Sequence, residues 1–213
     1  IISSNQTVSG LHYNIDTFRV NSGITASTAL GTNFAVYADQ YEGLGTINAS
    51  GLGYRGGRDG HGGDNGLGPG GGGIDSGGGH GGTGGGPAGG VQYGSISQPL
   101  DLGSGGGHQP GYGVTGGRGG GAIKIVTSGD IDVSGNILAN GVAGTGTYYS
   151  GGAGGSIWLQ AGGQMSGAGT ITVIGGPAFG AFGGAGGRIA LYYGSNTFSG
   201  TISANGGAGT SGI

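Results

Sequence analysis

The chain has 213 residues, of which 66 are glycine and only 5 are proline, and it carries a formal net charge of -3. Proline is scarce and glycine does not keep a strict triplet period, which excludes collagen. Disordered sequences combine few apolar residues with high net charge, whereas this chain is 33% apolar and 7% charged. The six basic residues are scattered and no apolar run has membrane-spanning length, so we expect neither nucleic-acid binding nor a membrane span.

Residues 1–50 predict an N-terminal β segment that leads into the first copy of a repeat. Apolar and polar side chains alternate over 11–15 and 18–20, which is the period of half-buried strands. The first clear copy follows, with the apolar positions Phe34 and Ile47 lying 13 residues apart. Helix is a poor reading, because Thr, Ser, Asn and Gly dominate and no apolar stripe recurs every 3.6 residues.

Residues 51–118 form a glycine-rich insertion that contains His61, His80 and His108. Three structures remain open for it. It is a flexible arm, a loop ordered only by a neighbour, or a bundle of extended polyglycine or polyproline-II-like strands joined laterally by backbone hydrogen bonds. Each ordered glycine costs roughly 0.5–1 kcal/mol of backbone entropy relative to alanine. So many glycines in an ordered segment imply close approach of backbones, which favours the bundle.

Residues 119–213 predict three further repeats in tandem. Ile123, Ile157 and Ile189 begin successive copies and are spaced 34 and 32 residues apart. A period in this range is typical of stacked units that cover one another's apolar faces. Each copy is expected to contain two strands, a glycine corner between them and a glycine-rich excursion.

Alternation within the strands predicts which side chains point inward. In the stretch 157–159, Ile157 and Leu159 share one face and Trp158 lies on the other. Lys124 occupies the same outward position one repeat earlier. We therefore predict an all-β fold, a parallel β-helix (β-solenoid) with the long glycine-rich insertion, forming one continuous domain over 1–50, 51–118 and 119–213. The expected core ladder comprises Phe34, Ile47, Ile123, Ile137, Ile157, Ile171, Ile189 and Ile202.

Two glycine-rich phrases recur along the chain. They read GGxGGxIxL and xSGxIxAxGG, at 151–176, at 183–207 and more loosely at 119–141. This pattern resembles the glycine-rich parallel β-helix repeats of large bacterial surface proteins, such as adhesins and filamentous-haemagglutinin-like proteins. The resemblance implies a surface location and says little about activity. The scarcity of Lys and Glu likewise favours an extracellular or cell-surface protein.

The two ends of the sequence suggest self-assembly. Placed after Ile213, the first residues continue the repeat, with Thr7 matching Thr197 and Ile1 falling opposite Leu191. We therefore expect copies to stack head to tail through Ile1, Ile2, Val8 and Ile213. The alternative is that the chain, which begins with Ile rather than Met, is cut from a longer repeat protein.

Candidate catalytic and metal-binding residues are few. Asp130 and Asp132 share a strand face, but without a second acidic cluster we expect a solvated pair and no enzyme activity. Residues 57–66 faintly resemble a calcium-binding nonapeptide, and a single imperfect copy is weak evidence. The three histidines of the insertion lack the spacing of a zinc site and are expected to be exposed loop residues. We predict no cofactor and no metal.

The preferred function is a non-catalytic structural subunit of an extracellular filament, surface fibre or biofilm matrix, with copies of itself as its partner. The second is an adhesin module that binds glycans or other surface proteins. Its aromatic side chains would be Tyr148, Tyr149, Trp158, Tyr192 and Tyr193. An ice-binding surface would need a regular array of threonines, which this chain lacks.

Overall fold

The computed structural model describes residues 1–108, 110–111, 114–146 and 148–209 of the chain. Over these residues the regular structure consists of β-strands, as the alternating pattern predicted. The strands are β1 (Gln6–Val8), β2 (Gly10–Val20), β3 (Thr25–Thr28), β4 (Asn33–Gly43), β5 (Thr46–Asn48), β6 (Ala122–Thr127), β7 (Ile131–Val133), β8 (Asn136–Leu138), β9 (Ser156–Ala161), β10 (Gln164–Ser166), β11 (Thr170–Thr172), β12 (Arg188–Tyr192), β13 (Ser195–Asn196) and β14 (Thr201–Ser203).

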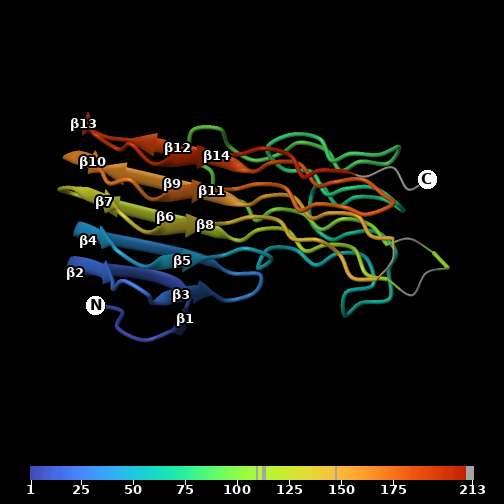
Figure 1. The fold of residues 1–213 in the computed structure, drawn as a ribbon, viewed down its shortest axis with the longest axis horizontal. Coiled ribbons are helices and arrows are strands. Elements are labelled where there is room, and N and C mark those ends of the chain that lie inside the picture. The colour runs from blue at the N-terminus through green and yellow to red at the C-terminus, as the bar shows by residue number, and fades with distance from the viewer. Residues whose placement is uncertain (109, 112–113, 147, 210–213) are drawn as a thin grey trace.

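The strands form two parallel sheets. The six-stranded sheet has the order β1-β3-β5-β8-β11-β14. The eight-stranded sheet has the order β12-β9-β6-β4-β7-β10-β13, with β2 paired to β4 as well. In Figure 1 the strands occupy one half of the molecule and are layered from the N-terminal strands at the bottom to β12, β13 and β14 at the top. The first and last strands therefore lie at opposite ends of the stack.

The core lies where the inward side chains of the two sheets meet. Equivalent residues of successive repeats pair directly, so Ile123 pairs with Ile157 and Ile157 pairs with Ile189. Ile123 and Ile157 are fully buried, as are Val36, Ile125 and Leu159 in the neighbouring row. Burying a side chain of this size stabilises the fold by roughly 1.5–3 kcal/mol. These rows of aliphatic side chains are the main apolar contribution to stability.

The prediction of a parallel β-helix with one glycine-rich insertion is wrong. The strands gather into two large sheets, of six and eight strands, instead of a coil of uniform turns. The eight-stranded sheet arises because β4 runs without interruption from Asn33 to Gly43 and pairs with both β6 and β7. Alternation of side chains shows which face of a strand is buried. It does not show how many strands share one sheet.

The repeats also contain more strands than expected. Each later repeat has three strands instead of two, for example β9, β10 and β11. In the repeat that begins at Ile157, the additional strand is β10, which is centred on Met165; this side chain is buried and pairs with Ile131. The two short alternating stretches expected within 11–20 form one long strand, β2, with a bulge between His12 and Ile15.

Glycine-rich arms extend away from the sheets and make up the other half of the molecule (Figure 1). They leave the six-stranded sheet after β5, β8, β11 and β14. Each arm bonds to its neighbours through the backbone, as when Gly154 N–H donates to Ala185 O at 2.9 Å and Gly152 N–H donates to Val142 O at 3.1 Å. A Cβ added to Gly154 would clash with the carbonyl oxygen of Val173. Glycine is required here because the backbones approach too closely for any side chain.

The insertion 51–118 is part of this arm bundle. Gly81 N–H donates to Gly186 O at 2.9 Å, and Gly78 N–H donates to Gly151 O at 3.1 Å. Farther along, the segment 91–102 crosses the outer face of the eight-stranded sheet. It is held by Ser156 Oγ–H, Arg188 Nε–H and Tyr192 Oη–H, which donate to backbone carbonyls of Asp101, Tyr93 and Ser97.

Candidate assembly and binding surfaces

The two ends of the strand stack are sheet edges that pair with no further strand among the described residues. One end is formed by β1 and β2, and the opposite end by β12, β13 and β14 (Figure 1). Alternate residues of an edge strand point their N–H and C=O groups away from the sheet, where a further strand would pair with them. All strand pairs are parallel, so the two ends present matching strand directions.

The structure places the predicted assembly residues in different environments. Ile1 is 81% exposed, and Val8 is half-buried on β1. Ile2 is buried and bridges to Val20, and its N–H donates to Arg19 O at 2.7 Å. Ile2 therefore belongs to the fold of its own chain. Ile213 lies outside the described residues.

The strand registers define how a second copy would be aligned. Following the pairs from β1 through β3, β5, β8 and β11 to β14 puts Thr7 in the same row as Ser203. The expected match of Thr7 with Thr197 is therefore wrong. The row next to it contains Gln6 at one end and Ile202 at the other. The stretches 7–10 (TVSG) and 197–200 (TFSG) are similar in sequence, which suggested the match. Thr7 lies on a strand and Thr197 lies outside the strands, so the two residues are not structurally equivalent.

The predicted ladder residues occupy two rows. Phe34, Ile123, Ile157 and Ile189 form one row in the eight-stranded sheet. Ile47, Ile137, Ile171 and Ile202 form the other row in the six-stranded sheet. Six of these residues are buried, whereas Ile189 is half-buried and Ile202 is 48% exposed. Among these eight residues, exposure is confined to the last repeat, because no further strand of the described residues covers it.

Two of the inward rows are polar at one end of the stack and aliphatic at the other. At the N-terminal end these two rows finish with the polar side chains Gln6 and His12, although the inward residues Phe18 and Val20 of β2 are apolar. At the other end they finish with Leu191 and Ile202, which are aliphatic and incompletely covered. The C-terminal end thus exposes apolar surface in direct continuation of the core.

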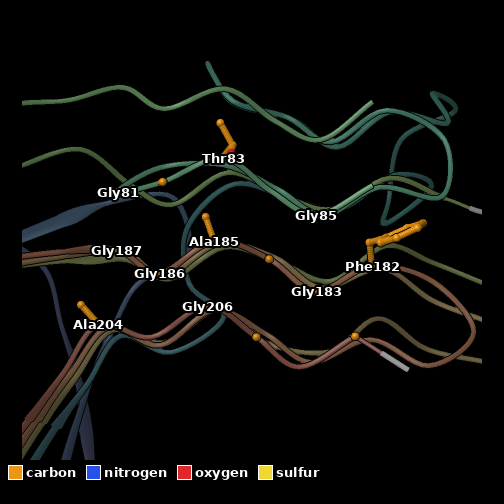
Figure 2. A pocket seen from close by; sticks show the side chains of 14 residues that line it. Gly81, Thr83, Gly85, Phe182, Gly183, Ala185, Gly186, Gly187, Ala204 and Gly206 are labelled. Carbon is orange, nitrogen blue, oxygen red and sulfur yellow. The ribbon is translucent and has the colours of Figure 1, made fainter. Parts of the chain in front are cut away.

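A groove of about 580 Å³ runs along the arm bundle next to this end. Figure 2 shows its walls: the segment 183–187 lies between the segment 81–85 on one side and the arm 204–209 on the other. The ring of Phe182 stands at one end of the groove, and Thr83 is the one polar side chain among the described residues of its lining. The groove therefore presents mainly peptide backbone.

A second cleft, of about 460 Å³, lies on the outer face of the eight-stranded sheet. Tyr13, Tyr37 and Asp39 are among its lining residues and are all exposed. Asn14, at the bulge in β2, has a φ of 58°. Such a conformation is uncommon for a residue other than glycine, and bulges are frequent beside functional sites because they redirect side chains. Sequence reasoning missed this cleft, because Tyr13 and Tyr37 come from different parts of the chain.

The aromatic residues that were expected to bind glycans do not form one surface. Trp158 is only 7% exposed, and Lys124 Nζ lies 3.7 Å from the centroid of its ring. Tyr192 is exposed and borders a small pocket with Trp158 and Gln98. Tyr193 is exposed as well. Tyr149 lies among the arms, with its ring centroid 6.4 Å from that of Phe179, and Tyr148 lies 6.2 Å from the same ring.

The histidines of the insertion were expected to be exposed, and for His80 and His108 this is wrong. Both side chains are buried, and each Nδ1 lies 2.8 Å from a backbone carbonyl, that of Gly154 for His80 and that of Val114 for His108. Burial lowers the pKa of His80, an effect that the hydrogen bond to Gly154 O opposes. The local sequence showed no sign of this burial, because the neighbours of His80 along the chain are glycines and its ring packs against Tyr93, with the two ring centroids 4.8 Å apart.

The acidic residues serve local structure. Asp130 Oδ1 accepts a hydrogen bond from Gln164 N–H at 2.7 Å, and Asp132 Oδ1 accepts one from Ser134 Oγ–H at 2.7 Å. In the calcium-like stretch 57–66, Asp59 pairs with Arg118 and Asp64 pairs with Arg58. These contacts lower the pKa of both carboxyl groups, chiefly through the hydrogen bonds from arginine. Within the described ranges, no three His, Asp or Glu side chains are grouped as a metal site would require.

Comparison with protein-family models, with curated proteins and with solved structures found no match. Across the described residues there is also no helix of the length and hydrophobicity needed to cross a bilayer.

Proposed function

We propose that this protein is a non-catalytic structural subunit of an extracellular filament or surface fibre that assembles head to tail by pairing of strand edges. The observation that carries the proposal is the pair of open, parallel edges at opposite ends of one stack. Pairing of β14 with β1 and of β12 with β2 of the next copy would continue both sheets across the junction. Two different surfaces meet in such a contact, and when it does not close into a ring it generates an open filament.

The exposed apolar side chains support the same junction. In the proposed register, Ile202 of one copy would be covered by the strand that contains Gln6 of the next copy. Covering aliphatic surface is favourable at roughly 25 cal/mol for each Å² removed from water. The low charge of the chain, 7% of its residues, offers little electrostatic resistance to stacking copies.

Electron microscopy and light scattering of the purified chain test this proposal. We expect filaments whose formation depends on concentration. The substitution Ile202→Asp should abolish them, because it places a charge in the junction. Leu67→Asp is the matched control, since Leu67 is 43% exposed on the insertion and lies outside both sheets. A chain that stays monomeric at high concentration would rule the proposal out, as would an Ile202→Asp variant that polymerises normally.

A second candidate function, glycan binding, is favoured by the cleft that contains Tyr13, Tyr37 and Asp39. Aromatic faces cover the apolar side of a sugar ring, and carboxylate and amide groups bond to its hydroxyls. A glycan array tests this function. Binding that is lost in Tyr13→Ala and retained in Tyr193→Ala would support it, because Tyr193 is also exposed but does not line this cleft.

A further inference from the structure

The backbone groups that line the groove beside the arm 204–209 have the hydrogen-bonding pattern of one further position in the arm bundle. In each earlier repeat, an arm that returns to the eight-stranded sheet lies at the equivalent position. The returning arms end at Gly121, Gly155 and Gly187, which directly precede β6, β9 and β12. The register of the strands fixes this equivalence, because Ala122 pairs with Ser156 and Ser156 pairs with Arg188.

One row of backbone hydrogen bonds ends at the groove with a carbonyl group, which is a hydrogen-bond acceptor. Gly121 N–H donates to Ala49 O, Gly155 N–H to Ala139 O and Gly187 N–H to Val173 O, each at 2.7 Å. The next acceptor in the row is Ala204 O, which follows β14 as Val173 follows β11. Among the described residues, none donates to it.

A second row also ends in an acceptor. Gly152 N–H donates to Val142 O and Gly184 N–H donates to Gly176 O, and the next acceptor in that row is Gly207 O. It has no donor among the described residues.

The third row ends in a donor. Gly120 N–H donates to Ala153 O at 2.8 Å and Gly154 N–H donates to Ala185 O at 2.9 Å. The next donor is Gly186 N–H, which has no acceptor within the described part of the chain. Ala204, Gly207 and Gly186 all line the groove, and Ala204 and Gly186 are labelled in Figure 2.

The two arms that each pack on an earlier returning arm show which sequence this position accepts, whereas the first arm, 117–121, carries Arg118. Residues 151–155 and 183–187 both read Gly-Gly-Ala-Gly-Gly. A Cβ added to Gly152, Gly154, Gly184 or Gly187 would clash with backbone of a neighbouring arm. The central residue has room for a methyl group, since Ala153 and Ala185 are buried there. An occupant of the groove must therefore carry glycine on both sides of a small central residue.

We propose that this groove is a peptide-binding site for an extended glycine-rich segment of the pattern Gly-Gly-Ala-Gly-Gly on another polypeptide. The segment would donate backbone N–H groups to Ala204 O and Gly207 O and accept a hydrogen bond from Gly186 N–H. Recognition rests on backbone bonds, as in peptides that add a strand to a sheet edge. Selectivity rests on the exclusion of side chains. The proposal concerns the arms and is independent of strand-edge assembly.

The experiment measures binding of a synthetic peptide with the sequence of residues 181–192 to the full chain, by isothermal titration calorimetry. The control peptide carries Gly184→Ala and Gly187→Ala, which leave its strand portion unchanged. We expect the control peptide to bind at least about tenfold more weakly. A tenfold loss of affinity corresponds to about 1.4 kcal/mol, which is the scale of one hydrogen bond.

Variants of the protein locate the site. Gly206→Val adds bulk to the groove, and the nearest atom to its new Cβ would be Gly184 O at 3.6 Å, so the fold has room for the change. Gly62→Val is the matched control, because no atom lies within 4 Å of the added Cβ and Gly62 is not part of the groove. Unfolding curves establish that both variants are folded.

We expect Gly206→Val to weaken peptide binding at least about tenfold and Gly62→Val to leave it unchanged. The proposal is overturned if the peptide does not bind the folded chain, or if the control peptide or the Gly206→Val variant binds as well as the originals. It is also overturned if the chain self-associates without peptide and Gly206→Val removes that association. In that case the occupant is a second copy.

Discussion

Lys124 and Trp158 are cross-strand neighbours on β6 and β9, and Lys124 Nζ lies 3.7 Å from the centroid of the Trp158 ring system. The ring of Tyr37, on β4, lies on the other side at 5.0 Å. A cation held between two aromatic rings across three strands links those strands on the outer face of the sheet.

The substitution Lys124→Met tests this interaction, because it keeps the aliphatic stem and removes the charge. We expect the free energy of unfolding to fall by about 0.5–2 kcal/mol. Trp158 is the only tryptophan of the chain, so its emission spectrum reports the change directly. Unchanged emission together with unchanged stability would contradict the importance of the contact.

The aliphatic rows predict a large cost for core truncation. Ile157 is fully buried between Ile123 and Ile189, and Ile157→Ala should lower the free energy of unfolding by about 2–5 kcal/mol. Ile96→Ala, at an exposed position, should change it by no more than about 0.5 kcal/mol. Chemical denaturation measures both. Equal changes in the free energy of unfolding for the two variants would show that this row of buried side chains does not stabilise the fold as proposed.

The arm bundle predicts unusual sensitivity to a single methyl group. Gly154→Ala would force a Cβ against the Val173 carbonyl, and we expect a loss of about 3 kcal/mol or more from overpacking and broken backbone bonds. Gly62→Ala adds the same methyl where no atom lies within 4 Å. Comparison of the two melting temperatures checks the prediction, and similar values would refute close arm packing.

Tyr41 predicts a substitution that stabilises the fold. Its hydroxyl is buried and has no hydrogen-bond partner among the described residues, and burial raises the pKa of this group. Tyr41→Phe should therefore keep or increase the free energy of unfolding, by up to about 1 kcal/mol. Tyr93→Phe is the contrasting control, since the Tyr93 hydroxyl donates a hydrogen bond to Leu102 O. Removing this hydroxyl should lower the free energy of unfolding by about 1 kcal/mol. A clear loss in Tyr41→Phe would contradict the assignment.

His80 predicts a loss of stability in acid. Because burial depresses its pKa in the folded state, the unfolded chain binds the proton more readily. Arg188 adds to this depression, whereas Asp101 and the Gly154 carbonyl oppose it. The stability that depends on neutral His80 is fully present above about pH 6.5, which is the ordinary pKa of histidine. This stability is lost as the pH falls below that value.

Melting temperatures between pH 7 and pH 5 check the His80 prediction. The wild type should lose stability over this range, and His80→Gln should have a flatter profile. His12→Gln, at an exposed position, should retain the wild-type slope. Identical slopes for all three proteins would exclude His80 as the acid-sensitive group.

Part of the architecture could be predicted from the sequence, because alternation and spacing are local signals. The all-β class follows from stretches such as Ile157-Trp158-Leu159, in which inward and outward side chains alternate. The number of strands in each sheet could not be predicted. It depends on β4 continuing through Asp39 and Gln40, where composition alone suggests a turn as readily as a strand.

The candidate surfaces were harder to predict. The groove is defined by backbone groups of Gly186, Ala204 and Gly207, which carry no side-chain signal and lie on different arms. The cleft at Tyr13 and Tyr37 depends on the alignment of β2 with β4. Both features require knowledge of which distant segments are neighbours.

The pairing of β4 with β6 has a kinetic consequence. The chain between these two strands, residues 44–121, contains β5 and the whole insertion, so a long loop must close before the central strands meet. Ile123, Ile157 and Ile189 are separated by only 34 and 32 residues and can come together sooner. Long-range pairing slows folding, and the C-terminal repeats should therefore act as the nucleus onto which the N-terminal strands dock last.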